Sequence, residues 1–174
     1  MSGDLQFLQL ALDRAKECVP TPTAFCVGCA IVIPHPISDV PVVLETGYSR
    51  ELPGNTHAEA NALTKARHLT SQRLSELLGE SSPPSIEELL ERSDVYTTME
   101  PCSVRLSGLR PCADSLIEAH IRRCIIGVSE PPDFVKCEGA SKLQAAGIEV
   151  VWLAGLEKEC LEVARRGHSL ETTV

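Results

Sequence analysis

Two Pro-Cys pairs follow a His-Ala-Glu triplet in this chain, and these three short motifs constrain its fold more than any other feature. The motifs are His57-Ala58-Glu59, Pro101-Cys102 and Pro111-Cys112. One imidazole, two thiols and an unpaired carboxylate are the groups that a catalytic zinc site requires. Nitrogen and sulfur hold the metal, the fourth position stays open for water, and the carboxylate moves protons. The sequence therefore predicts a Zn²⁺ site with Glu59 as its catalytic group. The predicted metal ligands are His57, Cys102 and Cys112.

Both ligand regions fall where a strand or a loop gives way to a helix. Asn55 or Thr56 is a favourable N-cap, which predicts that His57 lies in the first turn of the second helix. Pro111 suits the first turn of the third helix, because its missing N–H would be unpaired there anyway, and Cys112 follows it. The partial positive charge at a helix N-terminus lowers the pKa of a thiol and favours the thiolate that binds zinc.

Each of these residues also has an ordinary structural explanation. Thr56-x-x-Glu59 is a capping box, in which Glu59 would only cap backbone N–H groups. A single Cys is usually a small core residue, and a single His is more often hydrogen-bonded than bound to metal. The four groups together, flanked by the two prolines, favour a metal site over coincidence. The remaining cysteines are predicted to be core residues: Cys18, Cys26, Cys29, Cys124, Cys137 and Cys160.

The length and the hydrophobic pattern predict one domain over residues 1–174. Residues 70–92 change character around Ser81-Ser82-Pro83-Pro84, and we expect a surface insertion there. No apolar run approaches the length that spans a bilayer. The first 20 residues carry Asp4 and Asp13 and lack a basic region before an apolar stretch, so we expect no signal peptide, no membrane partner and a cytoplasmic location.

The charge of the chain argues against a nucleic-acid partner. Its net charge is −8, and only 3% of its residues are aromatic, whereas proteins that grip a nucleic-acid backbone usually present a basic face and aromatic side chains for stacking. The closest approach to a basic patch consists of Arg105, Arg110, Arg122 and Arg123. The composition therefore predicts a small-molecule substrate.

Hydrophobic periodicity predicts an α/β fold. Predicted strands cover residues 26–33, 40–46, 95–98, 124–128 and 148–153, and predicted helices cover residues 4–19, 112–120, 139–146 and 156–166, with another from a cap at 55–56 to about residue 68. The first two strands are close enough to form a hairpin. Because the last three alternate with helices, we expect them to pair in parallel through right-handed crossovers. The expected architecture is a mixed five-stranded sheet with helices on both faces, in three α/β/α layers.

The motifs resemble the zinc-dependent cytidine-deaminase superfamily, whose signature is H-x-E followed by P-C-x-x-C. In this chain nine residues, Ser103 to Pro111, separate the two cysteines instead of two. The longer loop is similar to that of the pyrimidine deaminases of riboflavin biosynthesis, where it helps to hold a phosphorylated substrate. The resemblance implies a cytidine-deaminase-like fold.

A more detailed resemblance is to the fungal-type diaminohydroxyphosphoribosylamino-pyrimidine deaminases. It is carried by residues 98–103, 105–108, 130–131, 134–135 and 137–139, with weaker support from residues 27–32 and 146–150. It implies hydrolytic deamination of 2,5-diamino-6-ribitylamino-4(3H)-pyrimidinone 5′-phosphate to 5-amino-6-ribitylamino-2,4-pyrimidinedione 5′-phosphate and ammonia. The chain departs from the bacterial relatives in two ways. Their Asn-Pro pair before the first strand is replaced by residues 21–25, and we expect no counterpart of their fused reductase domain within these 174 residues.

Substrate contacts follow from side-chain chemistry and from this resemblance. The predicted substrate-binding residues are Thr23, Phe25, Asn55, Ser103, Arg105 and Ser107. Arg105 is the first choice for the phosphate, because a guanidinium binds phosphate oxygens as a bidentate fork, and its alternative is an exposed surface charge. Asn55 contacts the base or the ribityl chain unless it only caps the helix. Phe25 stacks on the ring unless it belongs to the core.

Two other functions remain open at this point. One is deamination of cytosine, cytidine or tRNA adenosine, against which the long inter-cysteine loop and the acidic charge both count. The other is a non-catalytic zinc-binding subunit, which would have no use for Glu59 and would usually close its metal site with four protein ligands. The superfamily resemblance also implies a homodimer.

Overall fold

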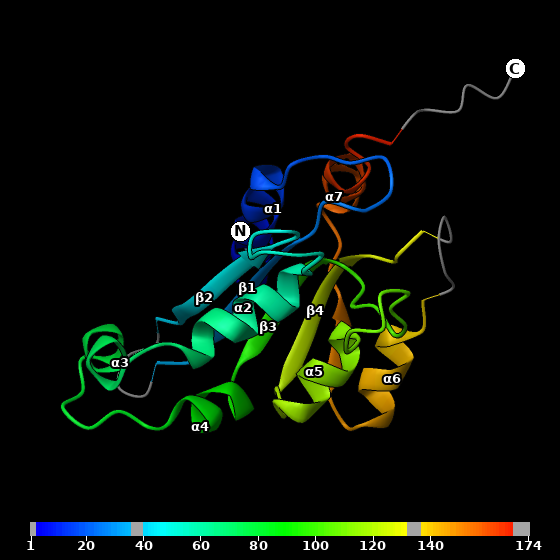
Figure 1. Ribbon diagram of the computed structural model, residues 1–174. Helices are drawn as coiled ribbons and strands as arrows, with labels where there is room; N and C mark the ends of the chain where they lie inside the picture. The colour runs from blue at the N-terminus through cyan, green and yellow to red at the C-terminus, as the bar shows by residue number, and fades with distance from the viewer. Residues whose placement is uncertain (1–2, 36–39, 132–136, 169–174) are drawn as a thin grey trace, which may run out of the picture.

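A mixed five-stranded sheet organises the computed structural model, which describes residues 3–35, 40–131 and 137–168 (Figure 1). The strands are β1 (Gly28–Ile33), β2 (Val42–Tyr48), β3 (Asp94–Met99), β4 (Arg123–Val128) and β5 (Glu149–Trp152). Their order across the sheet is β2-β1-β3-β4-β5. Strand β1 runs antiparallel to both β2 and β3, and β3, β4 and β5 are mutually parallel. The predicted hairpin and the predicted parallel pairs are confirmed.

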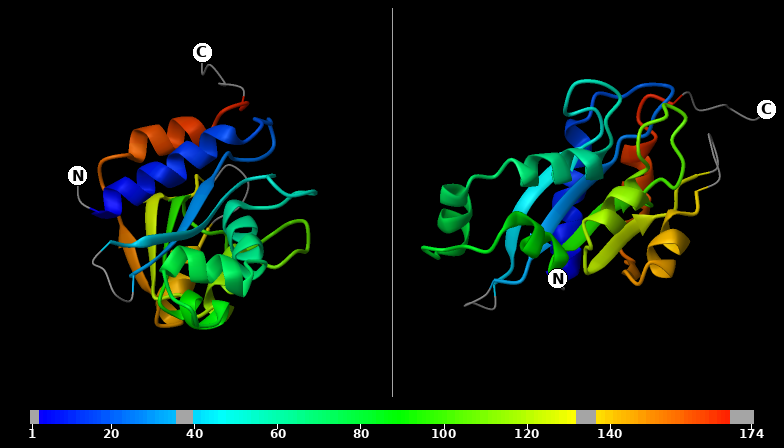
Figure 2. Two further views of the ribbon diagram at one scale, coloured as in Figure 1. Left: turned by 90° about the vertical axis from the view of Figure 1, so that its left-hand side faces the viewer. Right: turned by 60° about the horizontal axis from the view of Figure 1, so that its bottom comes forward.

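Helices cover both faces of this sheet, as the two views in Figure 2 show. They are α1 (Gly3–Glu17), α2 (Ala58–Arg67), α3 (Ser71–Leu78), α4 (Ile86–Glu91), α5 (Cys112–Glu118), α6 (Gly139–Ala145) and α7 (Glu157–Ala164). Helices α1 and α7 pack on one face, and α2, α5 and α6 pack on the other. The expected three-layer α/β/α arrangement is therefore confirmed. Within the described ranges, every helix is too short or too polar to cross a bilayer.

Strand β1 explains why part of the sequence is an uninterrupted apolar run. Its alternate residues Cys29, Ile31 and Ile33 join the core on the α2 side, whereas Ala30 and Val32 join the core on the α1 side. Successive side chains of a strand point to opposite faces. A strand covered by helices on both faces therefore needs apolar residues at every position.

Residues 70–92 form the short helices α3 and α4 at the periphery of the fold (Figure 1). Thr70 caps α3, and Ser85 caps α4 in a capping box with Glu88. Four leucines of this segment are nevertheless buried in the core on the α2 side: Leu74, Leu78, Leu89 and Leu90. The segment therefore enlarges the core as well as the surface of the domain.

Candidate metal and substrate site

The fold brings together three side chains that are distant in the sequence. His57 precedes α2, Cys102 follows β3, and Cys112 begins α5. The His57 Nδ1 atom lies 3.5 Å from the Sγ atom of Cys102 and 3.5 Å from that of Cys112. Each residue contributes one possible ligand atom, and these three atoms all lie within 4.8 Å of one another. These three residues could therefore hold one metal ion.

The spacing of these atoms fits tetrahedral zinc. Zinc lies about 2.3 Å from a thiolate sulfur and about 2.0–2.1 Å from an imidazole nitrogen, so a tetrahedral angle separates sulfur from nitrogen by about 3.6 Å. The observed separations are 3.5 Å. An imidazole nitrogen has one lone pair and can accept from only one thiol at a time, yet two sulfurs approach Nδ1 equally closely. A shared cation at their centre would account for that convergence.

Electrostatics at the two thiols favour a thiolate at Cys102. The hydrogen bond from the Cys112 side chain lowers the pKa of the Cys102 thiol most, and the His57 ring lowers it further, although burial opposes both effects. The backbone N–H of Cys112 also donates to Cys102 Sγ at 3.3 Å. The same thiol–thiol bond raises the pKa of Cys112, together with burial. These opposite shifts favour loss of the proton from Cys102 before Cys112.

Helix boundaries here differ from the sequence prediction by one residue. His57 is the N-cap of α2 rather than a residue of its first turn, and Pro111 is the N-cap of α5 rather than its first helical residue. Both caps have extended backbone conformations and no side-chain capping bond. Their role as caps places His57 and Cys112 side by side at two helix N-termini, where partial positive charge favours a thiolate.

Glu59 is buried beside the three ligands and does not cap the helix. The residue is 3% exposed, and Oε1 lies 3.1 Å from the hydroxyl of Thr97. That hydroxyl has one proton to donate, either to Glu59 or to the Met99 carbonyl at 2.9 Å. Burial is the main cause that raises the pKa of Glu59, and the nearby Cys102 raises it further. The Thr56 hydroxyl instead donates to the carbonyl of Leu52 at 3.0 Å. The capping-box explanation of Glu59 is therefore wrong.

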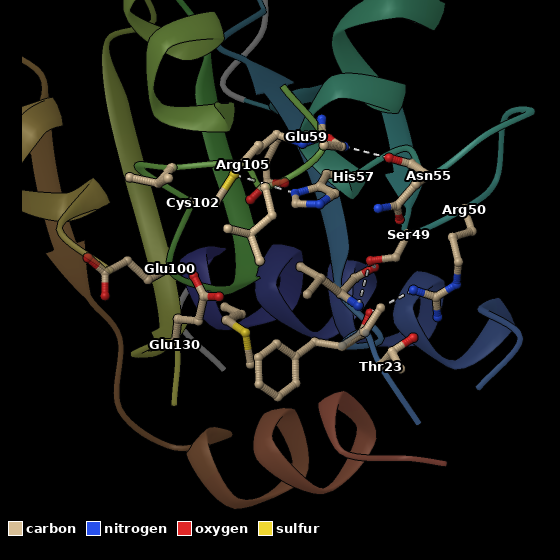
Figure 3. A pocket seen from close by; sticks show the side chains of 17 residues that line it. Thr23, Ser49, Arg50, Asn55, His57, Glu59, Glu100, Cys102, Arg105 and Glu130 are labelled. Carbon is tan, nitrogen blue, oxygen red and sulfur yellow. Dashed lines mark hydrogen bonds between the residues drawn. The ribbon is translucent and has the colours of Figure 1, made fainter. Parts of the chain in front are cut away.

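A pocket opens over the metal-binding group (Figure 3). Its walls come from residues 23–27 before β1, from the connection between β2 and α2, from residues 99–107 at the end of β3 and after it, and from Glu130 after β4. His57, Glu59 and Cys102 line the pocket, whereas Cys112 is fully buried behind them. The arrangement offers three metal ligands and leaves a carboxylate and an open space on the same side.

Five of the six predicted substrate-binding residues line this pocket: Thr23, Phe25, Asn55, Arg105 and Ser107. The Arg105 guanidinium donates to the backbone carbonyl of Asn55, so it bridges two walls and is not simply an exposed surface charge. Ser103 does not line the pocket, because its hydroxyl turns away and accepts from the backbone N–H of Glu138 at 3.0 Å. Phe134 and Val135, which contribute to the sequence resemblance, lie outside the described residues.

Four polar residues of the pocket have no substrate role in the sequence prediction: Ser49, Arg50, Glu100 and Glu130. Ser49 accepts from the backbone N–H of Val27 at 3.0 Å and thus joins two walls. Glu100 accepts from the backbone N–H of Ala140 at 2.9 Å. Burial raises the pKa of Glu130 to about 7. Only Glu100 and Glu130 had a sequence signal, because both lie in segments that carry the family resemblance, whereas Ser49 and Arg50 belong to no motif.

Comparison with known families identifies the protein family to which this chain belongs. The zinc-binding region that defines cytidine and deoxycytidylate deaminases matches residues 1–128, which include all three ligand positions and Glu59. The chain belongs to the cytidine and deoxycytidylate deaminase family. The family resemblance inferred from the H-x-E and Pro-Cys motifs is confirmed.

Individual relatives point to one branch of this family. The diaminohydroxyphosphoribosylamino-pyrimidine deaminase of Schizosaccharomyces pombe is 39% identical over 163 residues, which make up 94% of this chain and 35% of that protein. The riboflavin biosynthesis protein RibD of Actinobacillus pleuropneumoniae is 33% identical over 160 residues, or 90% of this chain and 34% of that protein. The chain thus spans about a third of the length of these curated relatives.

A solved structure matches this chain along nearly the whole length of the chain. The truncated Rib2 deaminase of Aspergillus oryzae is 34% identical, with a TM-score of 0.78 over 97% of this chain and 94% of that one. The same Aspergillus protein in complex with DARIPP is 32% identical, with a TM-score of 0.74 over 97% and 93% of the two chains. The predicted cytidine-deaminase-like fold is therefore confirmed.

Proposed function

We propose that this protein is a zinc-dependent deaminase of riboflavin biosynthesis. It hydrolyses 2,5-diamino-6-ribitylamino-4(3H)-pyrimidinone 5′-phosphate to 5-amino-6-ribitylamino-2,4-pyrimidinedione 5′-phosphate and ammonia. The observation that carries this proposal is the buried Glu59 carboxylate beside one imidazole and two thiols, a combination of ligands that suits an open zinc site. Similarity to the Aspergillus Rib2 deaminase that binds DARIPP supports the substrate class.

His57, Cys102 and Cys112 would hold the zinc, which supplies Lewis-acid activation of water when it is bound. Glu59 handles the protons of the reaction. Its carboxylate accepts one proton from the attacking water and delivers it to the ring nitrogen. It then accepts the second proton of that water, from the hydroxyl on the tetrahedral carbon, and gives it to the amino group, which departs as ammonia while the carbonyl forms. The Thr97 hydroxyl, 3.1 Å from Glu59 Oε1, holds the carboxylate in place for these transfers.

The charges of the pocket support an anionic substrate. Arg50 and Arg105 both line it, and neither belongs to an ion pair with a carboxylate among the residues that the structure describes. Two guanidinium groups without a direct ion-pair partner suit a phosphate dianion, and the carboxylates of the same pocket belong to Glu59, Glu100 and Glu130. Arg105 is the phosphate ligand in this proposal, because the one described hydrogen bond of its guanidinium, to the Asn55 carbonyl, leaves donors of its fork available.

Replacing Arg105 by Ala is expected to weaken binding of the phosphorylated substrate selectively. Loss of a charge-assisted contact of about 1.5–3 kcal/mol corresponds to a rise in KM of about tenfold to a hundredfold. The KM for the dephosphorylated analogue should change far less, because that compound has no phosphate to lose. Steady-state kinetics with both compounds provide the measurement. Equal effects on the two would reject a phosphate role for Arg105.

The proposed reaction is tested by mass spectrometry of zinc-loaded protein incubated with the diaminopyrimidine phosphate, with cytidine as a parallel substrate. Exchange of one amino group for oxygen on the pyrimidine phosphate, without reaction of cytidine, is the expected result. Reaction of cytidine alone would favour a nucleoside deaminase. No reaction of either compound, with one zinc bound per chain, would favour the non-catalytic alternative. We also propose a homodimer, by family resemblance, and a cytoplasmic location, as the sequence predicts.

A further inference from the structure

We propose that Arg50 is a positioning residue, whose side chain fixes one wall of the substrate pocket to the corner that carries the metal ligand His57. The wall is the segment of residues 19–25, which contributes Thr23 and Phe25 to the pocket. This inference rests on the proposed function for its substrate, and it extends that function by assigning a role to a residue outside the sequence motifs. It is a different role from that of Arg105, because Arg50 acts through the protein rather than on the phosphate.

The hydrogen bonds of Arg50 enclose this wall. Its Nη2 atom donates to the carbonyl of Val19 at 2.8 Å, and its Nη1 atom donates to the carbonyl of Phe25 at 3.2 Å. Nη2 also lies 2.7 Å from Cys18 Sγ and 3.6 Å from Cys26 Sγ. The guanidinium thus contacts both ends of the segment and draws them together.

The segment has little regular structure of its own to replace these bonds. It contains prolines at positions 20 and 22, which have no backbone N–H. Among the described residues, its one β-type pairing is an isolated bridge between Thr21 and Ala24. Carbonyls outside helices and sheets take hydrogen bonds from side chains or from water, and Arg50 supplies two such bonds, an exposed one to Val19 and a part-buried one to Phe25.

The backbone of Arg50 connects this wall to the metal-binding corner. Its N–H donates to the carbonyl of Thr56 at 2.7 Å, immediately before His57. Its φ angle is 64°, in the left-handed region that a side chain other than glycine rarely adopts. One residue therefore closes the β2–α2 turn with its main chain. Its side chain reaches the opposite wall, and a dashed line in Figure 3 marks a hydrogen bond of its guanidinium there.

Arginine is suited to this position because its planar fork can donate in several directions at once. A lysine ammonium keeps the charge but lacks the fixed fork, so it cannot reach the Val19 and Phe25 carbonyls together. The described hydrogen-bond acceptors of Arg50 are uncharged carbonyls and thiols. None of these acceptors is a carboxylate. Substitution of Arg50 therefore removes the positioning bonds without leaving a buried negative charge unpaired among them.

Arg166 provides a matched control on the same part of the chain. Its Nη2 atom donates to the carbonyls of Ala15, Lys16 and Cys18, at 3.0, 3.0 and 2.9 Å. It therefore holds the end of α1, just before the wall, but it does not line the pocket. An effect that comes only from the loss of hydrogen bonds between an arginine and backbone carbonyls should appear in variants of both Arg50 and Arg166.

The experiment compares Arg50→Lys and Arg166→Lys in the zinc-loaded protein. For Arg50→Lys we expect KM for the diaminopyrimidine phosphate to rise about tenfold, the size expected for loss of hydrogen bonds from a charged donor. Its kcat and zinc content should remain close to those of the wild type, because the wall contacts the substrate away from the reacting atoms. Arg166→Lys should lower the unfolding temperature and leave KM within about twofold.

Amide hydrogen exchange measured without substrate separates this inference from the proposed function. Exchange at residues 21 and 23–25 should be faster in Arg50→Lys than in Arg166→Lys, whether or not the wild type turns over the diaminopyrimidine phosphate. Unchanged exchange in Arg50→Lys would overturn the positioning role. So would an equal rise in KM in both variants, or a loss of zinc from Arg50→Lys. Failure of the wild type to react, with the exchange difference present, would instead reject only the assigned substrate.

Discussion

Glu59→Gln is expected to lower kcat by about 10²–10⁴-fold, the range that general acid–base groups contribute, while the protein still binds zinc. The amide has nearly the same shape as the carboxylate and still offers an oxygen to the Thr97 hydroxyl, 3.1 Å away in the native site. It cannot accept a proton from water and return it to the substrate. The side chain is buried, so the substitution also removes a group whose ionised form is disfavoured there. Folding should therefore not suffer.

Three measurements on the Glu59 variant decide this prediction: kcat, zinc content per chain and the unfolding temperature. Glu45→Gln is a suitable control, because Glu45 is a half-buried carboxylate on β2 that pairs with Lys65 and does not line the pocket. That control should keep wild-type kcat. Near-normal turnover by Glu59→Gln with zinc retained would show that another group moves the protons.

Much of the fold could be predicted because burial leaves a direct mark on sequence. Strand β1 lies between two helical layers, and its continuous apolar run predicted a buried strand. The alternation of strands and helices after residue 94 likewise predicted the parallel pairs. Boundaries were less predictable. His57 and Pro111 became caps rather than first-turn residues, because local sequence permits either position and packing selects between them.

The residues of the candidate site likewise divide into those that the sequence predicted and those that it did not. Imidazole, thiol and carboxylate groups with this chemistry are rare enough to be identified from short motifs, and the fold brings those of His57, Cys102 and Cys112 together. Side chains that act through tertiary contacts left no such mark. Arg50 follows no motif, and its importance arises from carbonyls that lie 25 and 31 residues away in the chain. Ser103 had suitable chemistry, but its hydroxyl is directed to Glu138 by the path of the loop.

Gly139→Ala is expected to be strongly destabilising, because α6 begins in contact with the metal-binding loop. A Cβ atom at residue 139 would lie 1.7 Å from the carbonyl oxygen of Pro101 and 2.9 Å from its carbonyl carbon. Real side chains do not approach backbone this closely, so α6 or the loop must move. The Glu100 carboxylate, which accepts from the backbone N–H of Ala140 at 2.9 Å, holds the same two segments together. Overpacking of this kind costs about 1–3 kcal/mol or more.

The displacement should also affect metal binding, because Pro101 immediately precedes the ligand Cys102. We therefore expect Gly139→Ala to lower both the free energy of unfolding and the zinc affinity, measured by denaturant titration and by competition with a chelator. Gly3→Ala is the matched control, since a Cβ atom there meets nothing within 4 Å, and its stability should stay within about 0.5 kcal/mol of the wild type. Wild-type stability in Gly139→Ala would mean that α6 does not pack against Pro101. Lost stability with unchanged zinc affinity would mean that α6 moves to accommodate the added Cβ atom and that the ligand loop does not.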